Sequence, residues 1–208
     1  MYIPASFSVT DQDEIEAFLQ RYDFATLVTA ADGNLTATHF PVVVRREASR
    51  LVVAGHVARA NSHWKALDGS TEALLIFQGP HAYVSPTWYA TGPAVPTWNY
   101  AVVHAYGPAQ AVEGAEFIED VLNALVARYE GHRANPWRMD DLTVEYRRGA
   151  LAAVVGIRMP VLRIEAKFKL GQNRQAADRL GAILGLEQEG HAEAASLAMF
   201  MRSHLKDS

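Results

Sequence analysis

Positively charged and polar side chains gather between residues 54 and 65, where a predicted strand gives way to a short helix. Arg59 and Lys65 supply fixed positive charge, and Asn61 and Ser62 stand where the start of a helix exposes unpaired N–H groups. Charged donors of this kind form strong hydrogen bonds to phosphate oxygens. The stretch therefore suits a phosphate, although a capped surface helix with solvated cations would contain the same residues.

The densest cluster of hydrogen-bond donors follows the most regular strand pattern in the chain, where apolar and charged side chains alternate. Lys167 and Lys169 share the charged face of that strand, and Gln172, Asn173 and Arg174 lead into the next helix. An anionic group is the natural partner of these donors. An exposed strand end followed by a helix cap would also explain them without a ligand.

A third polar group lies in a strand nearer the N-terminus. Thr36, Thr38 and His39 alternate toward one face of this strand, where their polar atoms could bond the edge of a flat ring. The alternative is an ordinary strand whose threonines face solvent.

A proline-framed turn forms a fourth candidate for ligand contact. Pro93 and Pro96 stiffen it, and Thr97, Trp98 and Asn99 follow. A rigid turn carrying an indole and an amide can form one wall of a site for a heterocycle. An aromatic loop of this kind equally often buries a contact between subunits.

Other kinds of site find no support in the sequence. There is no cysteine, so thiolate metal sites and cysteine nucleophiles are excluded. The 8 histidines show no metal-binding spacing, and we expect no metal. Glycine-rich phosphate loops and the nucleophile elbow of serine hydrolases are absent from the sequence.

The charge balance disfavours nucleic acid as a partner. The chain carries 19 Lys and Arg against 23 Asp and Glu, a net charge of -4, whereas DNA binding depends on neutralising phosphates. From residue 171 onward, the four basic residues are Arg174, Arg179, Arg202 and Lys206, and the five acidic ones are Asp178, Glu187, Glu189, Glu193 and Asp207. A recognition helix needs cations for phosphates, so direct DNA contact is doubtful. No apolar run approaches the roughly 20 residues of a membrane span, and the lack of cysteine suits the cytoplasm.

The elements that must hold these residues are mostly strands. Helices are expected over 11–22, 61–67, 115–130, 174–186 and 190–205, with 135–150 helical or irregular. Strands are expected over 24–30, 35–44, 51–56, 73–77, 81–85, 98–112 and 161–170, with Gly79-Pro80 separating two of them. Six or seven strands joined by short turns predict a closed antiparallel barrel with helices packed around it. No linker is evident, so residues 1–208 are expected to form a single domain.

Several segments together resemble the PaiB-type family of FMN-binding negative transcriptional regulators. They begin with the first four residues, Met-Tyr-Ile-Pro, and continue through residues 24–28, 37–41, 55–61 and 76–86. The most specific are Val95-Pro96-Thr97-Trp98-Asn99-Tyr100 and Lys167-Phe168-Lys169-Leu170-Gly171-Gln172-Asn173-Arg174. They occur in the family's order over nearly the whole chain.

The resemblance implies a mainly β fold with flanking helices, a six-stranded antiparallel split barrel of the FMN-binding type that forms a homodimer. It implies FMN near the subunit interface and a role in negative regulation, in the original case of protease production and sporulation. Gly171 stands where the family usually has Ser, so one hydroxyl donor is missing.

The resemblance also implies a distribution of roles around the cofactor. Arg59 and Lys65 would hold the phosphate, the ring would lie against the Thr36–His39 strand, and Thr97 to Asn99 would come from the partner subunit. The complete expected set is Thr36, Thr38, His39, His56, Arg59, Asn61, Ser62, Lys65, Thr97, Trp98, Asn99, Lys167, Lys169, Gln172, Asn173 and Arg174.

Three functions stay open at this point. The first is an FMN-binding regulator, in which flavin occupancy or redox state changes a contact with a partner. The second is an FMN-dependent oxidoreductase or flavin reductase, and the third is a haem-handling barrel. Related split barrels support all three activities, so the fold alone does not choose between them.

Overall fold

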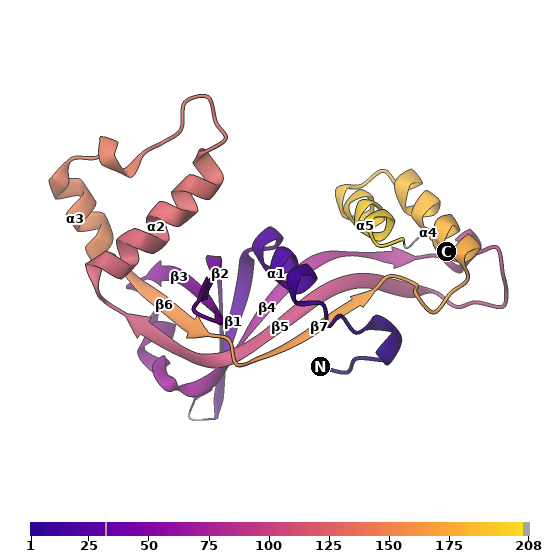
Figure 1. Ribbon diagram of the computed structural model, residues 1–208, viewed down its shortest axis with the longest axis horizontal. Helices are drawn as coiled ribbons and strands as arrows, with labels where there is room; N and C mark the ends of the chain where they lie inside the picture. The colour runs from indigo at the N-terminus through magenta and orange to yellow at the C-terminus, as the bar shows by residue number, and fades with distance from the viewer. Residues whose placement is uncertain (32, 206–208) are drawn as a thin grey trace. The chain divides into compact units, whose positions relative to one another are not determined.

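The computed structural model describes residues 1–31 and 33–205 (Figure 1). The strands are β1 (Phe24–Ala31), β2 (Asn34–Glu47), β3 (Arg50–Ala58), β4 (Asp68–Val84), β5 (Thr97–Val112), β6 (Val154–Pro160) and β7 (Arg163–Lys169). The α-helices are α1 (Gln12–Arg21), α2 (Ala115–Glu130), α3 (Val144–Ala152), α4 (Ala176–Gln188) and α5 (Ala192–Ser203). Four short 3-10 helices join them: η1 (Ala5–Phe7), η2 (Ser62–Ala66), η3 (Pro86–Trp88) and η4 (Met139–Asp141).

The strands form one sheet in the order β4-β1-β2-β3-β6-β5-β7, and a further pairing joins β4 to β5. Six strands therefore pair in a ring, and β7 extends it from β5. The registers of β1 with β2 and β4, and of β6 with β3 and β5, are all antiparallel. This arrangement confirms the predicted antiparallel β fold with flanking helices.

Two expectations about the strands were wrong. Gly79-Pro80 does not interrupt the chain's path, because β4 runs through both residues as one strand. Gly79 is needed there for space, since a Cβ at this position would lie 2.7 Å from the Phe18 ring. Strand β6 was not predicted at all, although it pairs with both β3 and β5.

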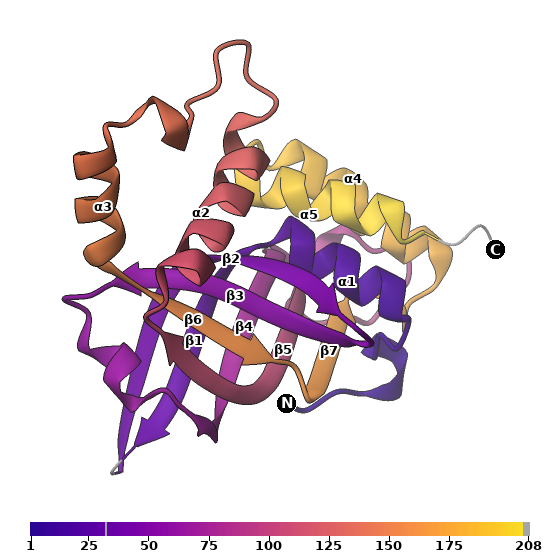
Figure 2. The same ribbon diagram turned by 60° about the vertical axis from the view of Figure 1, so that its left-hand side comes forward.

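The chain forms two compact units, and β4 and β5 contribute residues to both. The larger unit comprises Leu19–Phe77 and His104–Ile164. In it, α2 packs across β2, β3 and β6 (Figure 2). Beneath α2, Ala54 is buried with Val121 and Leu125. A Cβ on Gly156 would lie 2.6 Å from the Phe117 ring, so that ring fills the space left by the glycine.

The smaller unit comprises Met1–Phe18, Gln78–Val103 and the residues from Glu165 onward. Helices α4 and α5 pack side by side in it (Figure 1). Its core contains a cluster of three rings, in which the Phe168 ring centroid lies 4.9 Å from that of Phe18 and 5.2 Å from that of Phe200. This apolar centre holds β7 and therefore positions the lysines of that strand.

Candidate functional site

A buried imidazole organises the polar residues at the start of η2. His63 is 5% exposed, and its Nε2 lies 2.7 Å from Thr29 Oγ1 while its Nδ1 lies 2.8 Å from Thr38 Oγ1. The Asn61 amide donates to Thr38 Oγ1 over 3.2 Å, and Asn61 Oδ1 accepts from the His63 backbone N–H over 3.0 Å. Thr38 and Asn61 therefore hold the turn in place. Neither Thr29 nor His63 had been predicted as a site residue.

The surroundings of this imidazole keep it neutral. Burial lowers the pKa of His63 below its ordinary value of 6.5. A neutral ring has one N–H donor and one acceptor nitrogen, so one of the two threonine hydroxyls accepts and the other donates. The spacing of Thr29, Thr38, Asn61 and His63 matches no known sequence motif. The sequence alone therefore did not indicate this network.

Arg59 is occupied within its own chain. Its Nε donates to the Ala152 carbonyl over 2.8 Å, its terminal nitrogens bond Glu113 at 2.5 Å and the Val154 carbonyl at 3.2 Å, and it lies over the Trp64 ring. These contacts tie the end of β3 to the segment that enters β6. The guanidinium thus has a structural role that the sequence did not indicate.

Three of the predicted donors near η2 form no such side-chain hydrogen bonds or ion pairs with the described residues. Ser62 and Lys65 are exposed at η2, and Thr36 is exposed on β2. The Lys65 ammonium lies 5.9 Å from the centre of the Trp64 ring and makes no ion pair within residues 1–31 and 33–205. This small set of a hydroxyl, an ammonium and a second hydroxyl is available to a ligand.

His39 and His56 lie on the other face of the sheet from Thr36 and Thr38. Successive side chains of a strand point to opposite faces, so His39 is directed away from Thr38, and its Nδ1 lies 3.0 Å from Thr26 Oγ1. His56 pairs with Gly156, over which the Phe117 ring of α2 lies. The expectation that His39 shares the threonines' face was wrong, because the two positions are adjacent in one strand.

His56 is unusual for another reason. Its Nδ1 is buried and has no hydrogen-bond partner in the described part of the chain. Burial lowers the pKa of His56 below its ordinary value of 6.5. The ring is therefore kept neutral on the side of the sheet that α2 covers.

In the smaller unit, Lys169 contacts the start of β5. Its ammonium donates to Thr97 Oγ1 and, over 2.7 Å, to the Trp98 carbonyl. Burial lowers the pKa of Lys169, and the nearby positive charge of Lys167 lowers it further. Lys167 is itself only 7% exposed, because the N-terminal segment covers this part of the predicted charged face.

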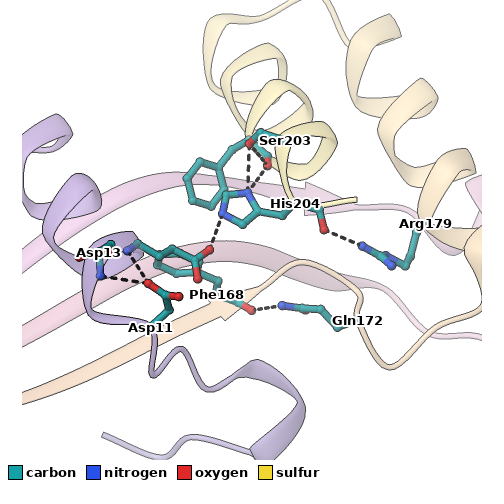
Figure 3. A network of polar contacts seen from close by, with 9 residues as sticks. Asp11, Asp13, Phe168, Gln172, Arg179, Ser203 and His204 are labelled. Carbon is teal, nitrogen blue, oxygen red and sulfur yellow. Dashed lines mark hydrogen bonds and ion pairs between the residues drawn. The ribbon is translucent and has the colours of Figure 1, made fainter. Parts of the chain in front are cut away.

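The remaining predicted residues have mainly structural contacts. The Gln172 side chain closes the turn after β7. It donates to the Phe168 carbonyl over 2.5 Å (Figure 3) and accepts from the Leu170 N–H over 2.7 Å. Asn99 is 2% exposed, and its amide lies 3.6 Å from the Met201 sulfur. Arg174 lies over the Tyr89 ring at 4.7 Å. Asn173 is exposed and makes no hydrogen bond with any described residue.

The aromatic loop before β5 docks on α4 of its own chain. A Cβ on Gly185 would lie 2.2 Å from the Trp88 ring, and one on Gly181 would lie 2.1 Å from the Trp88 carbonyl oxygen. Asp178, which is fully buried, accepts from the Thr91 N–H over 2.9 Å and from its hydroxyl over 2.6 Å. The Trp88 indole is thus partly buried against α4 within one chain, whereas Gly92, Pro93 and Val95 of the loop are exposed.

Helices α4 and α5 do not present free cations. The Arg202 guanidinium forms two bonds with Glu187, at 2.8 and 2.9 Å, and Arg179 donates to the His204 carbonyl over 3.2 Å. Figure 3 shows this second contact beside the ring of His204, which pairs with Glu14 at 3.0 Å. These helices hold each other rather than exposing a basic face.

The predicted site residues thus fall into two groups. Those from Thr36 to Lys65 belong to the larger unit, and those from Thr97 to Arg174 belong to the smaller one. Across the described residues, no three His, Asp or Glu side chains gather to hold a metal ion. No helix in residues 1–31 and 33–205 is long and apolar enough to cross a membrane.

Comparison with known proteins places this chain in context. Residues 1–163 match the family described as "Putative FMN-binding domain". The chain is 38% identical over 206 residues to "Protease synthase and sporulation protein PAI 2" of Bacillus subtilis, covering 99% of both proteins.

Solved structures with a similar fold include an FAD- and haem-binding protein from Mycobacterium smegmatis. Its TM-score is 0.58 at 17% identity, covering 84% of this chain and 79% of that one. The flavocytochrome Anf3 from Azotobacter vinelandii gives a TM-score of 0.56 at 18% identity, covering 78% of this chain and 69% of that one. At these identities the likeness establishes the fold alone, and it confirms the predicted split-barrel class.

Proposed function

Because this chain belongs to the family of FMN-binding domains, as the resemblance predicted, we propose that it binds FMN through the larger unit. The observation that carries the proposal is the family match over residues 1–163, which includes every predicted site residue of that unit. The exposed donors at η2 and β2 support it, since the polar groups around them are already bonded to one another.

The donor set fits the two ends of FMN. The Lys65 ammonium and the Ser62 hydroxyl would hold the phosphate, because charge-assisted hydrogen bonds favour a dianion strongly. Thr36 would bond the polar edge of the ring, and Thr38 would hold the turn beside it through its bonds with His63 and Asn61. Arg59 would hold the fold rather than the phosphate, given its three bonds within the chain. FMN, when bound, supplies hydride and electron transfer, and the protein supplies position and surroundings.

We also propose that two chains associate through the smaller unit. Trp98 is 54% exposed and Tyr83 is 44% exposed, and their rings meet edge to face at 6.5 Å. Val95, two residues before the start of β5, is 70% exposed. Exposed apolar groups gathered in one place commonly mark a protein interface. Replacing Trp98 and Tyr83 by serine should yield monomers in light scattering, whereas an unchanged mass would place the interface elsewhere.

The biological role that fits best is regulation through flavin occupancy, as the PaiB-type resemblance implies. The relative named for protease synthesis and sporulation supports this role. Direct DNA binding is not part of the proposal, because the net charge is -4 and Arg202 and Arg179 of α4 and α5 are bonded within the chain. Regulation would instead pass through another protein or a small molecule, in the cytoplasm.

The absorption spectrum of the purified protein tests cofactor identity. A two-band flavin spectrum after reconstitution with FMN supports the proposal, and a Soret band would indicate haem instead. Titration against promoter DNA at several salt concentrations tests the regulatory route. Nanomolar, steeply salt-dependent binding would contradict the proposed mechanism, since counterion release requires many phosphate contacts. Rapid NADPH oxidation with added FMN would favour an oxidoreductase.

A further inference from the structure

A pocket of about 370 Å³ lies between the C-terminal half of α2 and the segment that follows this helix. The chain leaves α2 at Glu130 and turns back toward α3, and residues 136–140 form the second wall (Figure 2). Small-molecule sites typically measure roughly 300–1,000 Å³, so this pocket has room for a small metabolite. Both walls belong to the larger unit, and none of the residues proposed to hold FMN lines the pocket.

Hydrogen bonds at Glu130 hold the two walls together. One of its carboxylate oxygens accepts from the Trp137 backbone N–H over 3.0 Å, and the other lies 3.1 Å from Arg133 Nε. The first bond joins α2 to the segment after it, and the second compensates the charge of Glu130. This carboxylate therefore shapes the pocket, and its charge is already matched within the chain.

Apolar side chains make up much of the lining. Val126 and Ala127 contribute from α2, and Trp137 and Met139 contribute from the other wall. Met139 is 8% exposed, whereas Trp137 keeps 47% of its surface exposed. Indole rings stack on other flat groups, and a thioether packs well beside an aromatic ring. A ligand with a flat aromatic group would bury this exposed surface.

Two charges in the lining are incompletely matched. The Arg138 side chain makes no hydrogen bond or ion pair with any residue of 1–31 and 33–205, and a guanidinium can bond both oxygens of a carboxylate. Asp140 bonds Arg147 Nη1 over 3.2 Å, but Arg147 also pairs with Glu119 at 3.3 Å. Asp140 is exposed, so its remaining lone pairs can accept from an ammonium. A ligand that carries both a carboxylate and an ammonium would match the two charges.

We propose that this pocket binds a free amino acid with an aromatic side chain. The aromatic group lies against Trp137, the carboxylate pairs with Arg138, and the ammonium pairs with Asp140. A phosphate in place of the carboxylate would bring a second negative charge toward Asp140 and Glu130, so the singly charged carboxylate is favoured. The site is separate from the proposed FMN site and does not depend on it.

NMR titration of the full-length protein tests this site with three probes: L-tryptophan, indole-3-propionate, which lacks the ammonium, and tryptamine, which lacks the carboxylate. Tryptophan should bind at least about tenfold more tightly than either analogue, because it alone makes both charged contacts. Arg138→Met should weaken tryptophan and indole-3-propionate by about tenfold and spare tryptamine. Asp140→Asn should weaken tryptophan and tryptamine and spare indole-3-propionate.

Arg148→Met serves as the matched control, because it changes the net charge equally at an exposed position of α3 outside the lining. It should leave the binding of all three probes unchanged. No tryptophan binding at millimolar concentration would overturn the proposal, as would an equal loss for all three probes in Arg138→Met, since no carboxylate contact would then be specific to that residue. Saturation with FMN should leave tryptophan binding unchanged, and competition between the two would also overturn the proposal. Flavin absorption reports FMN binding separately, so failure of either proposal is recognised by itself.

Discussion

The turn around His63 and the lysine edge of β7 both contain buried polar groups, but they differ in how those groups are satisfied. At the turn, both imidazole nitrogens, two threonine hydroxyls and an amide bond one another. At β7, Lys167 is almost as deeply buried, yet it meets one carbonyl and two aromatic rings. The first region is neutral and closed, whereas the second retains an uncompensated charge.

This difference separates residues that hold the fold from residues that are available to ligands. A polar group whose hydrogen bonds are complete contributes to stability, and its removal leaves its partners unsatisfied. A buried charged group without a counter-ion is stabilised when an anion binds beside it. The same distinction separates Arg59, which bonds three groups of the chain, from Lys65, which bonds none among residues 1–31 and 33–205.

The largest effect is expected from His63→Ala. It leaves a cavity and removes one hydrogen-bond partner from each of Thr29 and Thr38, so the free energy of unfolding should fall by about 2–4 kcal/mol. Urea unfolding followed by circular dichroism measures it. His39→Ala is the matched control, because His39 also bonds a threonine but is exposed, and it should change stability by less than about 0.5 kcal/mol. Similar losses in both variants would remove the distinction between closed and open polar groups.

Lys65→Met should weaken FMN binding by about tenfold while leaving riboflavin binding nearly unchanged. Only FMN carries the phosphate that the ammonium would contact. Fluorescence titration of the two flavins gives the ratio directly, and Lys65→Arg should restore most of the preference for FMN. An equal loss of affinity for both flavins would show that the phosphate lies elsewhere.

Arg59→Ala should act on stability rather than on the cofactor. The side chain is 38% exposed, so the loss of its three bonds should lower the free energy of unfolding by only about 1–2 kcal/mol. FMN affinity, measured where the variant is fully folded, should stay at the wild-type value. A loss of FMN affinity that spares riboflavin would return Arg59 to the phosphate site that the sequence predicted for it.

The smallest effect concerns pH. The pKa values of His56 and His63 are lowered in the folded protein, so the unfolded chain binds more protons below its ordinary histidine pKa of 6.5. Stability should therefore be complete above pH 6.5 and decline as the pH falls from there toward the folded values. Each histidine contributes at most about 1.4 kcal/mol per pH unit. Unfolding curves should show a shallower decline in His56→Gln, and an identical decline would exclude His56 as a contributor.

The sequence predicted the architecture well because its signals are local. The alternation before Leu170 and the apolar face of residues 115–130 follow directly from strand and helix periodicity. Strand β6 was not predicted because it follows a helix closely and is buried by strands that are distant in sequence. Gly79-Pro80 was wrongly predicted to separate two strands. In a sequence, a glycine that makes room for the Phe18 ring cannot be distinguished from one that ends a strand.

The candidate residues were found more easily than their roles. Residue type indicated that Arg59 and Lys65 carry charge. Only the tertiary contacts show that Arg59 is bonded to Glu113 and to two carbonyl groups, whereas Lys65 is not. His63 was missed as an organising residue because its threonine partners lie 34 and 25 residues away. Pairings over such separations depend on strand register, which a single sequence does not display.

The docking of Trp88 on α4 bears on how the protein withstands proteases. Exposed loops of small and polar residues are preferred sites of cleavage, and most of residues 89–96 are small. A protease must draw such a segment out into an extended form before cutting it. Here that step would require the indole to leave the surface formed by Gly181 and Gly185 and Thr91 to release Asp178. This loop is thus held as part of the folded body, and one methyl group at Gly181 would force the Trp88 carbonyl away from α4.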